Sequence, residues 1–154
     1  MRHPDRVPRE VRTSCTATTV CPNDQDLVIA VDTSALMAIA LGDAAAEACM
    51  KVLETEPDIL ISAGTVAEAL IVAARRGVGD GMTELIDGFG FDILSVTQAV
   101  ARRVADAYER WGQGVHPAGL NFGECFAYEV AREHSCPLLF VGEDFSETDL
   151  RSVL

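Results

Sequence analysis

The feature that most constrains the fold is a series of short apolar runs separated by longer segments with helical periodicity. The runs cover residues Leu27–Val31, Ile59–Ile61, Phe91–Val96 and Leu138–Val141. Runs that are apolar throughout indicate strands buried on both faces. Strands of this kind that alternate with helices predict a parallel sheet covered on both sides. We therefore expect a three-layer α/β/α sandwich with about four or five strands.

The segments between the runs predict helices, because their apolar residues recur every three or four positions and capping or breaking residues bound them. The expected helices are Ala35–Leu41, Ala44–Leu53, Thr65–Arg76, Gly79–Phe89, Thr97–Trp111 and Asn121–His134. Residues Ser152–Leu154 are expected to add a last edge strand.

The 154 residues fit one domain, since domains commonly run to about 100–200 residues. Residues 1–26 contain several prolines and no apolar face, which predicts a flexible extension, either a disordered arm or a mis-set translation start. Residues 27–154 form the predicted folded domain. The longest apolar run, Ala35–Leu41, is far shorter than the roughly 20 residues of a membrane-spanning helix. The lack of a secretory signal pattern and the irregular cysteine spacing favour a cytoplasmic protein with reduced thiols.

The net charge of −12 argues against simple electrostatic capture of nucleic acid. Residues 1–26 contain equal numbers of arginines and acids, so the whole excess lies in the predicted domain. Such an excess forms either a solvated surface or a group of acids around a cation. The positions of the acids in the predicted fold distinguish these two cases.

Four acids follow predicted strands or begin predicted helices. Asp32 follows the first strand and Asp144 the fourth, whereas Glu68 and Glu124 lie in the first turns of helices. Because strands end and helices begin at the carboxyl edge of such a sheet, all four positions open onto one rim, where ligands bind. Each acid also has a purely structural interpretation: Asp32 as a helix cap, Asp144 as a turn residue, and the glutamates as members of capping boxes.

The four acids taken together are harder to explain structurally. Clustered carboxylates repel one another and raise each other's pKa unless a cation compensates their charge. Oxygen ligands without histidine or cysteine suit Mg²⁺, or Mn²⁺ as an alternative. Such an ion can activate water and stabilise charge on a phosphate, which is the chemistry of phosphodiester hydrolysis.

The sequence lacks the residues that other functions of α/β domains require. The P-loop pattern is absent, and Lys51 is the only lysine. Gly77-x-Gly79-x-Gly81 follows a helix instead of a strand, so it is no dinucleotide fingerprint. A receiver-type phosphoacceptor domain needs an aspartate after the third strand and a late lysine, and neither is present.

Four motifs resemble those of the PIN-domain family, in order and at similar spacings. Val31-Asp32-Thr33-Ser34-Ala35-Leu36 resembles the opening motif, and Ala67-Glu68-Ala69 is similar to the region of the second acid. HPAGLNFGECFAY, from His116 to Tyr128, resembles an AGLN-[YF]-G-D-C-F block of one branch of VapC-type toxins. LLFVGEDF, from Leu138 to Phe145, is similar to the final motif, with Thr148-Asp149-Leu150 after it. The resemblance covers residues 27–154.

The resemblance implies a PIN fold and divalent-metal endoribonuclease activity. It also implies a homodimer and neutralisation by a cognate VapB-type antitoxin. Because the domain is acidic, we expect its substrate to be a structured RNA such as tRNA. Asp32, Glu68, Glu124 and Asp144 become the catalytic quartet, with Asp32 and Glu124 as the direct metal ligands. The resemblance also assigns a supporting role to Ser34, which could equally be a second cap hydroxyl. Asn121 and His116 are candidate supporting or substrate-binding residues, and the alternative for His116 is a solvent-exposed loop histidine.

The sequence departs from the family pattern at the third acid, which is usually aspartate and here is Glu124. The extra methylene moves the carboxylate by about one bond length, and a misplacement of about 1 Å can lower a rate roughly 100-fold. We expect a weaker or Mn²⁺-favouring nuclease. Two alternatives remain open: a weakly active or inactive PIN domain that binds a partner, and a PIN nuclease outside a toxin–antitoxin pair. The pairs Arg75-Arg76 and Arg102-Arg103 are candidate RNA contacts, and Trp111 is expected to pack at its helix end.

Overall fold

The computed structural model describes residues 28–154, and the expected extension over residues 1–26 lies outside them. Within this range the elements are the strands β1 (Val28–Val31), β2 (Asp58–Ser62), β3 (Asp92–Leu94) and β4 (Leu138–Leu139), and the helices α1 (Thr33–Leu41), α2 (Ala46–Thr55), α3 (Ala63–Arg75), α4 (Gly79–Phe89), α5 (Gln98–Trp111) and α6 (Phe122–Glu133). Every expected helix is present, with ends shifted by a few residues. The α/β class is confirmed.

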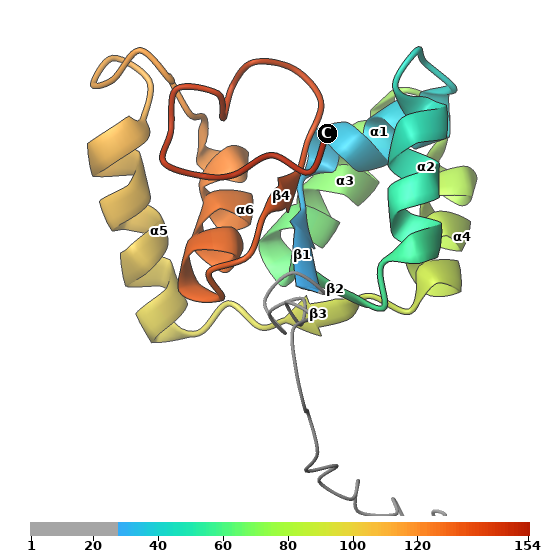
Figure 1. The fold of residues 1–154 in the computed structure, drawn as a ribbon, viewed down its shortest axis with the longest axis horizontal. Helices are drawn as coiled ribbons and strands as arrows, with labels where there is room; N and C mark the ends of the chain where they lie inside the picture. The colour runs from blue at the N-terminus through green and yellow to red at the C-terminus, as the bar shows by residue number, and fades with distance from the viewer. Residues whose placement is uncertain (1–27) are drawn as a thin grey trace, which may run out of the picture.

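The strands form one parallel sheet in the order β3-β2-β1-β4. Figure 1 shows α5 and α6 on one side of this sheet and α1 to α4 on the other. Strand order reverses beside β1, because β2 and β4 pair with its two edges. This is the kind of point at which α/β domains form their binding sites, at the carboxyl ends of the strands.

Each inner strand supplies side chains to two cores, one on each face of the sheet. In β1, Ile29 and Val31 join the core under α1 to α4, whereas Ala30 joins the core under α5 and α6. Leu138 and Leu139 of β4 divide between the two cores in the same way. This alternation follows from the two-residue period of a strand, and it explains why β1 and β4 are apolar at every position.

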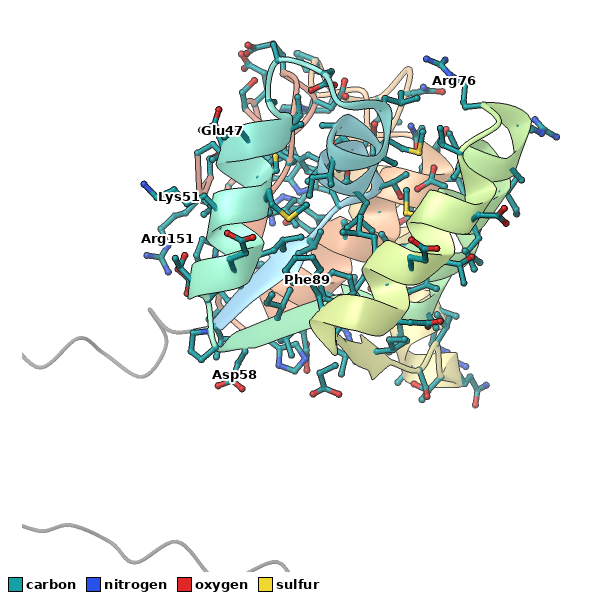
Figure 2. All side chains as sticks on the ribbon, turned by 90° about the vertical axis from the view of Figure 1, so that its right-hand side faces the viewer. Glu47, Lys51, Asp58, Arg76, Phe89 and Arg151 are labelled. Atoms are coloured by element: carbon teal, nitrogen blue, oxygen red, sulfur yellow. The ribbon has the colours of Figure 1, made fainter. Side chains whose placement is uncertain are left out.

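The helices above the first core turn charged side chains outward. Figure 2 shows Glu47 and Lys51 of α2 projecting away from the sheet, whereas Cys49 and Leu53 of the same helix are buried. In the part of the chain that the structure describes, no helix is long and apolar enough to cross a bilayer.

Three expectations about strands are wrong. The third strand covers Asp92–Leu94 instead of Phe91–Val96, and its residues are exposed or half-buried instead of buried on both faces. The segment Ser152–Leu154 is not a strand: Ser152 makes a single bridge with Leu138. The fourth strand ends at Leu139 instead of Val141. Its last expected residue leaves the ladder because the backbone N–H of Val141 donates a hydrogen bond to Ser34 Oγ at 3.0 Å.

Candidate active site

Asp32 lies at the carboxyl end of β1 and caps the N-terminus of α1. Its Oδ2 accepts hydrogen bonds from the backbone N–H of Ser34 at 2.9 Å and from Ser34 Oγ at 2.6 Å. The residue is only 3% exposed, and its Oδ1 is buried without a hydrogen-bond partner. The Asp32 pKa is raised to about 6, chiefly by burial and in part by the Glu68 carboxylate, against the lowering effect of the Ser34 hydrogen bonds.

Ser34 connects this cap to the residues that follow β4. Its hydroxyl donates to Asp32 Oδ2 and accepts the N–H of Val141. The sequence places Ser34 beside Asp32, but its contact with a residue 107 positions away depends on β4 lying next to β1. Ser34 therefore holds the Asp32 carboxylate against the sheet edge from which Asp144 follows.

Glu68 does not belong to a capping box, and that interpretation of the sequence is wrong. Helix α3 begins at Ala63 with Ser62 as its cap, so Glu68 lies in the second turn and Thr65 is buried. The Glu68 carboxylate instead reaches α1, where Thr33 Oγ1 donates a hydrogen bond to its Oε2 at 2.6 Å. This bond brings the second acid next to Asp32.

Glu124 begins α6 beside the same carboxylate. It forms a capping box with Asn121: the Glu124 N–H donates to Asn121 Oδ1 at 2.9 Å, and the Asn121 N–H donates to Glu124 Oε2 at 2.8 Å. The interpretation of Glu124 as a member of a capping box is therefore confirmed. A Cβ atom on Gly123 would collide with the Glu68 carboxylate, so Glu68 and the first turn of α6 are in close contact.

Electrostatic repulsion connects Glu124 with the three other acids of the predicted site. The Glu124 pKa is raised to about 7, chiefly by burial and in part by the carboxylates of Asp144, Asp32 and Glu68, against the lowering effect of the Asn121 hydrogen bond. Such repulsion acts only between charges that lie close together in a poorly solvated place. Glu124 is thus close to the three other acids, which are distant from it in the sequence, at one end of the sheet.

Within residues 28–154, no group of three or more His, Cys, Asp or Glu side chains has the arrangement of a ready-made metal site. The hydrogen bonds suggest a reason. Asp32, Glu68 and Glu124 each direct one oxygen to a donor of the protein itself. Mutual repulsion favours this separate tethering.

The remaining predicted residues lie on the approach to α6. Asn121 is the α6 cap. His116 Nδ1 accepts the N–H of Ala118 at 3.1 Å, and the ring packs edge-on against buried Trp111 at a centroid distance of 4.6 Å. Trp111 packs at its helix end as expected. Because Nδ1 is engaged, only Nε2 of His116 remains as a donor toward a ligand.

Of the two arginine pairs, Arg103 has a structural partner. Its Nε lies 2.7 Å from Oε1 of buried Glu129 and 3.4 Å from Glu133 Oε2. Sequence analysis missed this ion pair, and it also missed Thr33 as the partner of Glu68. The only local signal for Thr33 was its place between two residues of the opening motif.

The chain belongs to the PIN-domain family, whose match extends over residues 29–150. Its relatives include ribonucleases of the VapC type. Ribonuclease VapC42 of Mycobacterium tuberculosis is 37% identical over 125 residues, which is 79% of this chain and 95% of the relative. Ribonuclease VapC of Mycolicibacterium smegmatis is 36% identical over 126 residues, 80% of this chain and 98% of the relative.

Solved structures show the same fold. The crystal structure of M. tuberculosis VapC20, a toxin that cleaves the sarcin–ricin loop, matches with a TM-score of 0.68 at 18% identity and covers 81% of this chain and 98% of that one. VapBC2 of Rickettsia felis, bound to a DNA fragment from its promoter, matches with a TM-score of 0.61 at 12% identity and covers 81% and 96%.

Proposed function

We propose that this chain is a Mg²⁺- or Mn²⁺-dependent endoribonuclease and the toxin of a VapBC-type toxin–antitoxin pair. The observation that carries the proposal is the buried Oδ1 of Asp32, which has no hydrogen-bond partner and lies at the carboxyl end of the sheet with the carboxylates of Glu68 and Glu124 close by. The names of the relatives, ribonucleases at 36–41% identity, support the same reaction class. The proposed substrate is a structured RNA such as tRNA.

The residues present fit a hard divalent cation. Asp32 Oδ1 is a buried oxygen without a hydrogen-bond partner, which is the state expected of a ligand atom rather than of a structural cap. The candidate ligands are all carboxylate oxygens, the donors that Mg²⁺ and Mn²⁺ prefer. We propose that Asp32 and Glu124 bind the cation through Oδ1 and Oε1, the carboxylate oxygens that take no part in the helix caps.

A bound cation would supply an activated water and neutralise charge on the phosphate. The residues of the chain would orient the reactants around it. Glu68 and Asp144 would each accept a hydrogen bond from the attacking water or hold a second ion. The Nε2–H of His116 would donate to a phosphate oxygen. Ser34 and Asn121 would act indirectly, by fixing Asp32 and the first turn of α6.

We infer that RNA binding depends strongly on the cation. The folded domain carries the full charge of −12, so an RNA backbone is repelled at long range. Arg103, a predicted RNA contact, is already paired with Glu129. The cation at the quartet would therefore supply the main local attraction for a phosphate.

We propose that the protein is a homodimer formed through an apolar surface beside the site. Phe122 is 71% exposed and Ile71 is 56% exposed. Phe122 borders two hollows, one of about 340 Å³ shared with Glu68 and Ile71, and one of about 370 Å³ shared with Tyr108 of α5. An exposed apolar patch of this kind marks an interaction surface. A second copy that covers it would bring two acidic sites near each other.

The proposed second partner is a cognate VapB-type antitoxin. Its support is the family membership and the occurrence of toxin–antitoxin complexes among proteins of the same fold. Purification of the chain with the product of the adjacent gene tests this partner. If the two proteins do not form a complex, the assignment to a toxin–antitoxin pair is withdrawn while the nuclease remains to be tested.

One observation favours a second candidate, a PIN domain that only binds a partner. Glu124 uses one carboxylate oxygen in a complete capping box, so its replacement of the usual aspartate is compatible with a purely structural role. Such a scaffold would bind no divalent ion and would cut no RNA.

The two candidates are separated by calorimetric titration with Mn²⁺ and by an RNA cleavage assay on the same preparation. Asp32→Asn should abolish both signals. Asp58→Asn is the matched control, because Asp58 is an exposed acid that begins β2 and is labelled in Figure 2, and it should leave both unchanged. Cleavage that persists in EDTA and in the Asp32→Asn variant would exclude the proposed mechanism. Absence of Mn²⁺ binding in the millimolar range would favour the scaffold.

A further inference from the structure

The carboxylate of Glu68 has two neighbours that are not part of the acidic quartet. On one side, Thr33 Oγ1 donates a 2.6 Å hydrogen bond to Glu68 Oε2. On the other side, Gly123 leaves the space that this carboxylate occupies, since a Cβ atom there would collide with it. The two neighbours come from α1 and α6, so Glu68 of α3 lies between elements that are separate in the sequence.

Each neighbour is adjacent to an acid. Thr33 directly follows Asp32, and Gly123 directly precedes Glu124. The position of the Glu68 carboxylate relative to Asp32 and Glu124 is therefore set by these two contacts. A glutamate side chain has several rotatable bonds, and repulsion from Asp32 and Glu124 would otherwise favour rotamers that turn away from them.

The two contacts engage both oxygens of the Glu68 carboxylate. A threonine hydroxyl has one proton to donate, and here that proton goes to Oε2. Oε1 is the atom nearest to the place that a Cβ atom on Gly123 would take. The carboxylate is thus held from both sides.

We infer that Thr33 is a positioning residue for Glu68, and that Gly123 is required so that Glu68 can take this position. This inference rests on the proposed function, because Glu68 is assigned to the site there. Thr33 is buried and its hydroxyl donates to Glu68, so we expect its side chain to act through Glu68. Its role differs from that of Ser34, which holds Asp32.

The test compares Thr33→Val, which keeps the shape and removes the hydroxyl, with Thr33→Ser, which keeps the hydroxyl. Loss of a residue that orients a side chain of a metal site from the second layer typically lowers metal affinity or activity roughly 10–100-fold. We expect Thr33→Val to lower kcat about 10-fold or more with little change in KM, and to weaken Mn²⁺ binding in calorimetry. Thr33→Ser should restore both. Gly123→Ala should resemble Thr33→Val, because it displaces the same carboxylate.

Thr83→Val is the matched control, since the exposed Thr83 hydroxyl donates only to Gly79 of its own helix at 3.1 Å. It should behave like the wild type. If Thr33→Val keeps wild-type kcat and Mn²⁺ affinity, the inference is overturned. Equal losses in Thr33→Val and Thr33→Ser also overturn it, because the hydroxyl would then be irrelevant.

A crystal structure of Thr33→Val separates this inference from the proposed function. We expect the Glu68 carboxylate to leave its place between residues 33 and 123. If the wild type neither binds Mn²⁺ nor cuts RNA, the proposed function is wrong. The position of the Glu68 carboxylate in the Thr33→Val structure then still tests the positioning role of Thr33. An unmoved Glu68 in the variant overturns the positioning role.

Discussion

The buried carboxylate of Asp32 should make the metal-free protein less stable as the pH rises. Its pKa is raised from 3.8 to about 6, chiefly by burial. A carboxyl group whose pKa is higher in the folded state favours folding when protonated and opposes it when ionised. This contribution to stability is complete below about pH 4 and is lost as the pH rises through 6. At about 1.4 kcal/mol per pKa unit, the loss is on the order of 3 kcal/mol.

The perturbation that tests this reasoning is Asp32→Asn. Asparagine keeps an oxygen that can accept from the Ser34 N–H and removes the buried charge. Some of the gain is offset because the charge-assisted bonds from Ser34 become weaker. At pH 8 in EDTA we therefore expect the variant to be more stable than the wild type by roughly 2 kcal/mol, which for a domain of this size raises Tm by roughly 5–10 °C. At pH 4.5 the two should differ little.

Urea unfolding in EDTA at the two pH values measures the difference directly. Asp58→Asn serves again as the control, and its difference from the wild type should be small at both. Saturating Mn²⁺ should reverse the order, since a cation at 100 times its Kd stabilises the protein that binds it by about 2.7 kcal/mol. An Asp32→Asn variant that is less stable than the wild type at pH 8 in EDTA, or a difference that does not change with pH, refutes the argument.

Three further predictions concern α6 and its surroundings. Glu124→Asp should raise Mg²⁺ affinity or cleavage rate. It should also lower the free energy of unfolding by about 1 kcal/mol, because the shorter side chain loses its hydrogen bond with the Asn121 N–H. Calorimetry, cleavage assays and urea unfolding measure these effects, and no gain in affinity or rate would contradict the idea that the Glu124 carboxylate is misplaced. Gly64→Ala should destabilise the protein by roughly 1–3 kcal/mol, since its Cβ would lie 2.6 Å from the Phe126 ring. Gly81→Ala in α4 is the control, because a Cβ there meets open space, and it should be neutral or stabilising in the same unfolding assay. Equal effects of the two substitutions would contradict the packing argument. Phe122→Ser should dissociate the proposed dimer in light scattering; a dimer that persists places its interface elsewhere.

The order of helices and strands was predictable from local information. A strand buried on both faces and a helix with one buried face leave different periods in the chain, and the caps at Asp32 and Asn121 involve residues two or three positions apart. These features depend on neighbours in the sequence. The four acids could be placed on one rim by topology alone, because parallel strands all end at the same edge.

The partners of those acids were decided by the tertiary structure. Glu68 appeared to be part of a local capping box, yet it bonds to Thr33 because α3 begins earlier and packs beside α1. Val141 leaves its strand because Ser34 lies across the sheet edge. A hydrogen bond between residues 35 or 107 positions apart exists only after the strands have been ordered. The amino-acid sequence thus determined which chemical groups reach the rim, and the packing of α1, α3 and α6 decided which oxygens remain free to act there.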